Sequence, residues 1–294
     1  MDEFDSEYPI FLGSEIAQGK PEDALFHVIP VPYEASVSYG GGTSLGPSAI
    51  LKASWQLEEW DGKSKPCEQG IYTHPVVDCS VSPEQVIENI AAATKIAGDF
   101  AKIPVVLGGE HTVTYGVIKG LLESGVVNVN DIGIVQIDAH ADLRDAYEGD
   151  KLSHASVMKR IVDLGIPLFQ LGIRAFCEEE VETRKAANVH FIDADDLVPN
   201  NINEITLPED FPKNVFFTLD IDGMDPSVFP STGTPVPGGL SWYQTLSLFE
   251  SVAKQRNIIG FDIMEFAPIN GFHAYDFAAS FLTYKMMGIV ERNR

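Results

Sequence analysis

The chain has 294 residues, of which 45% are hydrophobic and 21% are charged, the composition of an ordinary soluble globular protein. Forty-three acidic residues against twenty basic ones give a net charge of -23, which disfavours nucleic acid and anionic membranes as partners. No apolar run is long enough to cross a bilayer, and the acidic start MDEFDSEYPIFLGSE lacks the features of a signal peptide, so a cytoplasmic protein is expected.

Short apolar runs alternate with longer segments of helical periodicity along the whole chain. The apolar runs predict strands at residues 25–31, 104–107, 132–138, 168–171, 215–220 and 258–261. The periodic segments predict helices at residues 47–56, 83–101, 113–122, 154–164, 178–187, 242–255 and 274–290. Strands without polar alternation, separated by helices, are typical of a mainly parallel sheet with helices on both faces. The fold class is therefore α/β, and ligands are expected beyond the carboxyl ends of the strands.

The stretch QIDAHADLRD, residues 136–145, follows one of these apolar runs. It places Asp138, His140 and Asp142 at alternate positions, and in an extended chain alternate side chains point to the same face. Two carboxylates and an imidazole are thereby expected side by side at the end of a buried strand. Because a buried carboxylate without a partner is costly, a positive group is expected among them.

Two other strand ends carry similar side chains, in GGEHT at residues 108–112 and in LDIDGMDP at residues 219–226. Each motif alone has an ordinary structural explanation, since acids at strand ends often cap the next helix. Together they supply four carboxylates and two imidazoles: His111, Asp138, His140, Asp142, Asp220 and Asp222. Two divalent ions would neutralise the four carboxylates, and a hydroxide could bridge them. Ligands of this kind without thiolate favour manganese, with zinc, cobalt and nickel as open alternatives.

This combination of motifs resembles the signatures of the ureohydrolase family, which comprises the arginases, the agmatinases and their relatives. GGEHT, DAHAD and LDIDGMDP are similar to the first, second and third signatures, although the family more often has Ser where Thr112 stands. The resemblance spans roughly residues 24–290, so residues 1–294 are expected to form a single ureohydrolase domain with residues 1–23 as an N-terminal extension. It implies a three-layer α/β/α sandwich, the arginase-like fold, and a trimer or hexamer of identical chains.

The resemblance also implies how two manganese ions would be bound. One ion would be ligated by His111 and Asp142 and the other by His140 and Asp222. Asp138 and Asp220 would bridge the pair. The two ions would lower the pKa of a shared water, so that hydroxide is present at neutral pH.

Three side chains are expected to act on a guanidino substrate. Glu265 could accept two parallel N–H bonds from a guanidinium and fix its plane. After hydroxide attack, Asp142 could receive a proton and His154 could relay one between the site and water. Without the resemblance, Glu265 could instead be a solvent-exposed acid before a loop, and His154 could cap a helix after Ser153.

The interval at residues 143–153 bears on the identity of the substrate. It lacks the run of Asn, Ser and Thr residues with which arginases bind an amino acid, and it carries Asp145, Glu148 and Asp150. Such an acidic rim suits a substrate whose far end is a cation. The expected reaction is therefore hydrolysis of agmatine to putrescine and urea, a step of polyamine biosynthesis.

Several alternatives remain open at the level of sequence. Three basic residues, Arg144, Lys151 and Arg174, could bind a carboxylate if they face the pocket. The substrate could then be guanidinobutyrate, a related guanidino compound or formiminoglutamate. The chain could also be a metal-binding homologue without activity.

Overall fold

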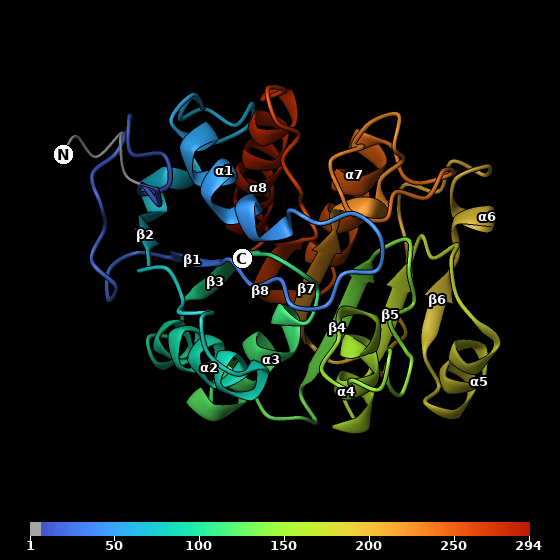
Figure 1. The fold of residues 1–294 in the computed structure, drawn as a ribbon. Helices are drawn as coiled ribbons and strands as arrows, with labels where there is room; N and C mark the ends of the chain where they lie inside the picture. The colour runs from blue at the N-terminus through green and yellow to red at the C-terminus, as the bar shows by residue number, and fades with distance from the viewer. Residues whose placement is uncertain (1–6) are drawn as a thin grey trace.

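Eight parallel strands form one sheet through the middle of the molecule, with helices on both faces (Figure 1). The structure is a computed structural model that describes residues 7–294. The strands lie in the order β2-β1-β3-β8-β7-β4-β5-β6. Their bounds are β1 Phe26–Val31, β2 Ile71–Thr73, β3 Ile103–Gly108, β4 Ile132–Ile137, β5 Leu168–Leu171, β6 His190–Ile192, β7 Asn214–Asp220 and β8 Asn257–Met264.

The helices form the two outer layers. Helices α1, α7 and α8 cover one face of the sheet, and α2, α3, α4 and α5 lie on the other (Figure 1). The bounds are α1 Gly46–Ser54, α2 Pro83–Asp99, α3 Val113–Ser124, α4 Val157–Asp163, α5 Glu178–Ala186, α6 Ala194–Leu197, α7 Trp242–Ala253 and α8 Ala274–Arg292. The predicted three-layer α/β/α sandwich around a parallel sheet is confirmed.

Two hydrophobic cores follow from the alternation of side chains along the strands. In β3, Val105 and Leu107 pack into the core beneath α1, α7 and α8, whereas Val106 packs into the core beneath α2, α3 and α4. In β4, Val135 packs into the core beneath α1, α7 and α8, and Ile134 packs into the core beneath α2, α3 and α4. Both strands are buried along their whole length, which is why their sequences are continuously apolar rather than alternating.

The sheet brings the predicted site residues together, because the carboxyl ends of parallel strands share one edge. Strands β3, β8, β7 and β4 are neighbours at the centre of the sheet. Their last residues are in register, with Leu107 beside Ile263 and Asp220 beside Met264. The segments after β3, β4, β7 and β8 therefore begin next to one another.

All six predicted strands and all seven predicted helices are present; β5 has its predicted bounds, and the others are shifted at one or both ends. Strand β8 runs to Met264, three residues beyond its predicted end, because it stays paired with β7 as far as Met264 beside Asp220. The acidic Asp262 within it is buried and accepts a hydrogen bond from Thr114. The helix predicted at 154–164 begins as a 3-10 turn, His154–Ser156, and continues as α4. Strands β2 and β6 were not predicted, since each has only three residues and lies at an edge of the sheet.

The described part of the N-terminal extension, residues 7–23, packs onto the domain through Phe11 and Leu12, which are buried. Their amides donate hydrogen bonds to the hydroxyls of Thr73 and Ser54. Residues 1–6 of the extension lie outside the described residues. From residue 7 onwards, none of the helices combines the length and apolarity that a bilayer span requires.

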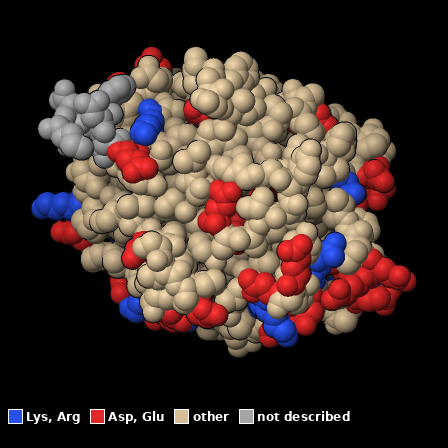
Figure 2. Space-filling view, viewed as in Figure 1, with Lys and Arg blue, Asp and Glu red and all other residues tan. Residues whose placement is uncertain are grey.

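The surface carries the charge expected from the composition. On the face shown in Figure 2, Asp and Glu side chains outnumber those of Lys and Arg, and many of them gather over α5. The first turn of α5 consists of Glu178, Glu179 and Glu180, which favourably face the positive end of the helix dipole.

Candidate metal centre and active site

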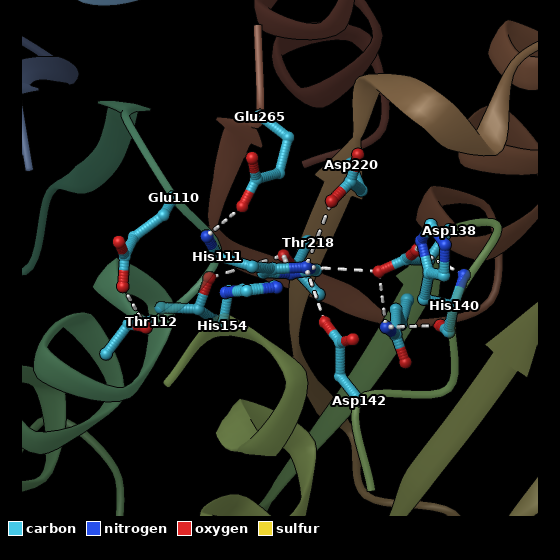
Figure 3. Close-up of polar contacts among 12 residues, drawn as sticks. Glu110, His111, Thr112, Asp138, His140, Asp142, His154, Thr218, Asp220 and Glu265 are labelled. Atoms are coloured by element: carbon cyan, nitrogen blue, oxygen red, sulfur yellow. Dashed lines mark hydrogen bonds and ion pairs between the residues drawn. The ribbon is translucent and has the colours of Figure 1, made fainter. Parts of the chain in front are cut away.

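Acidic and imidazole side chains from three loops converge at the carboxyl edge of the sheet (Figure 3). The first cluster consists of His111, Asp138 and Asp142, and the second consists of Asp138, His140 and Asp222. Within each cluster the candidate ligand atoms lie within 4.8 Å of one another. Two adjoining groups of three ligands therefore share one carboxylate.

Asp138 lies between the two histidines. Its Oδ2 atom is 3.1 Å from Nδ1 of His111, and its Oδ1 atom is 3.7 Å from Nδ1 of His140. Around His111, an oxygen of Asp142 lies at 3.1 Å and one of Asp220 at 3.3 Å. His140 has an oxygen of Asp222 at 3.0 Å. The structure thus brings all six predicted metal-site residues together.

The environment of His111 tests whether these residues fit a metal. Its Nδ1 atom is buried and has no hydrogen-bond partner, although three carboxylates surround it. Its other nitrogen, Nε2, lies 2.8 Å from the hydroxyl oxygen of Thr218. If Nε2–H donates to Thr218, the lone pair of Nδ1 faces the carboxylates, and a cation between them would stabilise this arrangement. The donor set therefore fits a metal ion.

The pKa shifts of the clustered side chains also indicate a cation site. Burial raises the pKa of Asp142 to about 7, and the charge of Asp138 adds to this rise. Burial also raises the pKa of Asp220 well above its usual value, with Asp222 contributing. For His140, burial would lower the pKa, but the carboxylates of Asp222 and Asp138 raise it to about 12. The clusters thus hold excess negative charge, which a divalent cation would neutralise.

Local structure differs from the prediction at the second motif. Strand β4 ends at Ile137, so DAHAD belongs to the following loop and is not a continuation of the strand. At Asp142 the backbone has φ 53°, a left-handed conformation that costs on the order of 1–3 kcal/mol in a non-glycine residue. The three side chains converge because the loop turns back, held by the His140 amide, which donates to Asp138 at 2.6 Å.

Glycine at position 223 allows the LDIDGMDP segment to lie close to the DAHAD segment. A Cβ atom there would lie 2.8 Å from the amide nitrogen of Asp138 and would clash with Ile137. The close approach lets the amide of Ala139 donate to Asp222 at 3.0 Å. Asp225 orders the turn that follows, since its carboxylate accepts hydrogen bonds from the amides of residues 227, 238 and 239. It belongs to neither cluster.

Glu265 follows β8 and points toward the first cluster (Figure 3). Its Oε1 atom accepts a hydrogen bond of 2.8 Å from the amide of His111. Its backbone is also left-handed, with φ 58°. Burial raises its pKa well above the usual value. The residue is partly buried and not exposed, so the alternative of a solvent-exposed acid is wrong.

His154 lies beside the clusters, at a cavity of about 290 Å³. His140, Asp142 and His154 line this cavity. The other residues of its wall are Ser38, Arg144, Tyr147, Ala155, Ala175, Phe176, Cys177, Glu180 and Thr234. Burial lowers the pKa of His154 to about 4, and the positive charges of His140 and His111 contribute. Its imidazole is therefore neutral at neutral pH.

The predicted rim residues divide between the cavity and the surface. Arg144 lines the cavity, 4.0 Å from a carboxylate oxygen of Glu180. Arg174 is fully occupied elsewhere, because its guanidinium donates to five backbone carbonyls, those of residues 172, 222, 223, 224 and 236. Lys151 pairs with Asp145 at 3.3 Å, outside the cavity wall.

None of the three acids of the predicted rim, Asp145, Glu148 and Asp150, lines the cavity wall, whose acidic residues are Asp142 and Glu180. Sequence reasoning missed Glu180 because it is the third of three consecutive glutamates on a helix, a pattern typical of a solvated surface. Ser36 and Ser38, which contact His154, and Glu110, which contacts Ser36, were also missed.

Comparison with known proteins identifies the family. A model of the Arginase family matches residues 24–288. The N(1)-aminopropylagmatine ureohydrolase of Synechocystis sp. is 39% identical over 278 residues, which cover 90% of this chain and 89% of that protein. The agmatinase of Pyrococcus horikoshii is 30% identical, covering 92% and 94%. Among solved structures, the agmatine ureohydrolase of Thermoplasma volcanium superposes with a TM-score of 0.81 at 28% identity, covering 96% and 97%. The chain therefore belongs to the arginase family of metal-dependent amidinohydrolases.

Proposed function

We propose that this protein uses two manganese ions to hydrolyse the guanidino C–N bond of agmatine or of an agmatine extended by an aminopropyl group. The products would be urea together with putrescine or spermidine, respectively. The observation that carries the proposal is the pair of clusters sharing Asp138, with Glu265 and His154 beside them. Mixed carboxylate and imidazole donors without a cysteine favour manganese.

The two clusters, together with the contact between Asp220 and His111, support the predicted distribution of ligands. His111 and Asp142 would hold one ion, His140 and Asp222 would hold the other, and Asp138 and Asp220 would be shared. The chemistry that such a pair of ions supplies is hydroxide at neutral pH. Orientation of the substrate and transfer of protons would be carried out by side chains of the protein.

Glu265 would orient the substrate. One of its oxygens is held by the His111 amide, which fixes the carboxylate next to the first cluster. A guanidinium bonded to this carboxylate would present its planar carbon to the clusters. Asp142 and His154 both line the cavity and would move the protons that the departing amine requires.

The cavity and the relatives favour a cationic aminoalkyl chain as the rest of the substrate. Beyond His154 the wall offers the rings of Tyr147 and Phe176 and the carboxylate of Glu180, which suit methylene groups and an ammonium. The acidic surface over α5 would favour the approach of a cation (Figure 2). Relatives named N(1)-aminopropylagmatine ureohydrolase are 32–39% identical to this chain, and relatives named agmatinase are 30–31% identical. The extended substrate is therefore preferred.

Arg144 favours a second candidate, guanidinobutyrate. It is the one basic side chain in the described cavity wall that could bind a terminal carboxylate. Its charge is partly offset by Glu180, 4.0 Å away, which makes this candidate the weaker one.

Urea release under manganese saturation tests these candidates. The panel consists of N(1)-aminopropylagmatine, agmatine, guanidinobutyrate, arginine and formiminoglutamate. A higher kcat/KM for either agmatine compound than for the three carboxylates supports the proposal. A higher value for guanidinobutyrate would move the assignment to the second candidate. The trimer or hexamer and the cytoplasmic location stay predictions.

A further inference from the structure

Both ring nitrogens of His154 form hydrogen bonds with serines of one loop, residues 36–38, which is distant in the sequence. Nδ1 lies 2.8 Å from the hydroxyl oxygen of Ser36, and Nε2 lies 2.8 Å from the hydroxyl oxygen of Ser38. The backbone amide of His154 also donates to the Ser36 hydroxyl, at 3.0 Å. The Ser36 oxygen therefore contacts two polar atoms of the same histidine.

Glu110 determines the direction of the Ser36 hydroxyl. This carboxylate is buried, and it accepts hydrogen bonds from the amides of Ala35 at 2.5 Å and Ser36 at 2.6 Å. It also accepts the hydroxyl protons of Thr112 at 2.6 Å and Ser36 at 2.9 Å (Figure 3 draws the Thr112 contact). Both amides reach Oε2 and both hydroxyls reach Oε1, so each carboxylate oxygen acts as an acceptor and the one proton on the Ser36 oxygen points to Glu110.

A consequence follows for the imidazole. A serine oxygen has two lone pairs, and in Ser36 one accepts from the His154 amide. The other can form a hydrogen bond with Nδ1 only if Nδ1 carries the proton. His154 is then the Nδ1–H tautomer, and Nε2 has a lone pair that accepts the hydroxyl proton of Ser38.

We propose that Glu110 and Ser36 are positioning residues that hold His154 as the Nδ1–H tautomer, and that Ser38 passes protons between Nε2 and solvent. This inference rests on the proposed function, in which His154 moves a proton during turnover. Ser36 cannot reverse its hydrogen bond, because Glu110 holds its proton. Ser38 can, because its side chain is exposed and its hydroxyl both donates and accepts.

The proton balance is simple. Protonated Nε2–H gives its proton to the Ser38 oxygen while the Ser38 hydroxyl gives its own proton to water. His154 returns to the neutral Nδ1–H form, and Ser38 is regenerated. Uptake runs through the same steps in reverse.

Kinetics of serine variants test the positioning role. Ser36→Ala should lower kcat about 10- to 100-fold while KM and bound metal stay within about twofold, and Ser36→Thr should restore most of kcat. Ser38→Ala should lower kcat about tenfold, with partial rescue by added imidazole. The control is Ser44→Ala, in the same loop, whose hydroxyl donates to Glu34 at 2.7 Å and does not touch His154. Wild-type kcat in Ser36→Ala, or an equal loss in Ser44→Ala, would overturn the proposal.

The tautomer can also be measured without turnover. Nitrogen NMR of ¹⁵N-histidine-labelled protein, loaded with diamagnetic Zn²⁺ and compared with His154→Asn for assignment, distinguishes Nδ1–H from Nε2–H. The Nδ1–H pattern is expected in the wild type and its loss is expected in Ser36→Ala. An Nε2–H signal in the wild type would refute the inference and leave the proposed substrate untouched. Failure of every guanidino substrate with an intact Nδ1–H signal would refute the proposed function alone.

Discussion

The Nε2 atom of His111 lies 2.8 Å from the hydroxyl oxygen of Thr218, while Nδ1 faces the carboxylates of the first cluster. Behind Thr218, the buried Asp262 accepts a hydrogen bond of 2.8 Å from Thr114. A hydroxyl that accepts from Nε2–H fixes the tautomer whose Nδ1 lone pair can bind a metal.

The first prediction concerns this contact. Thr218→Val should weaken manganese binding about 10- to 100-fold, because the His111 ring loses the partner that orients it. Isothermal titration of metal-free protein with Mn²⁺ measures the effect. Thr283→Val, which removes a hydroxyl bonded to a carbonyl within α8, is the matched control and should bind manganese normally. Equal affinity in the two variants would rule out the orienting role.

The second prediction is a requirement for two divalent ions. Exhaustive chelation should abolish activity, and Mn²⁺ should restore it at about two ions per chain, counted by atomic absorption. Asp138→Asn should be more damaging than His140→Ala, because the two oxygens of Asp138 face different histidines. Full activity in metal-free protein would contradict the binuclear site.

The third prediction separates substrate positioning from metal binding. Glu265→Gln retains an oxygen that can accept from the His111 amide but removes the charge that would face a guanidinium. Turnover should fall at least about 100-fold and KM should rise, whereas the metal content should not change. Loss of metal from this variant would mean that Glu265 is a ligand. His154→Ala should likewise lower turnover with both ions retained.

The fourth prediction concerns charge selection in the cavity. Arg144→Gln removes the basic side chain near Glu180, so KM for agmatine should fall about two- to tenfold and KM for guanidinobutyrate should rise. Arg160→Gln serves as the control, since Arg160 pairs with Asp145 outside the cavity. A higher KM for agmatine in Arg144→Gln would show that Arg144 does not oppose cationic substrates.

The fifth prediction concerns pH and the buried pair of histidines beneath the edge of the sheet. Nδ1 of His27 lies 2.9 Å from Nε2 of His74, and burial lowers the pKa of His74 to about 4 and also lowers that of His27. Unfolded histidine titrates near pH 6.5, so the unfolded chain binds more protons between about pH 4 and 6.5. The contribution to the free energy of unfolding is fully present above about pH 6.5 and is lost as the pH falls toward 4.

Urea denaturation of the wild type and of His74→Gln at several pH values between about 4.5 and 7.5 measures this contribution. The wild type should lose on the order of 2 kcal/mol more stability over that range than the variant, which lacks the buried His74 imidazole. Parallel curves for the two proteins would mean that the pair is protonated in the folded state.

The metal-site residues could be predicted from the sequence because each lies directly after a buried apolar strand. Parallel strands bring such positions to one edge regardless of loop details. The surroundings of His154 could not be predicted in this way. Ser36 lies 118 residues away in the sequence, in a polar, glycine-rich segment whose pattern indicates only a turn. Strands β2 and β6 could not be predicted, because three residues at the edge of a sheet are too few to show a periodic pattern of apolar side chains.

The position of β8 has a consequence for how the protein is made. Strands β1–β3 form one part of the sheet and β4–β7 form the other, and β8, the last strand in the chain, joins them. His111 follows β3, whereas Asp220 ends β7, so the two come together only after residues 257–264 have left the ribosome and inserted. Such long-range parallel pairing is slow. The first cluster, which needs His111, therefore forms only after β8 has joined the two parts, and an ion held by this cluster would bind late in biogenesis.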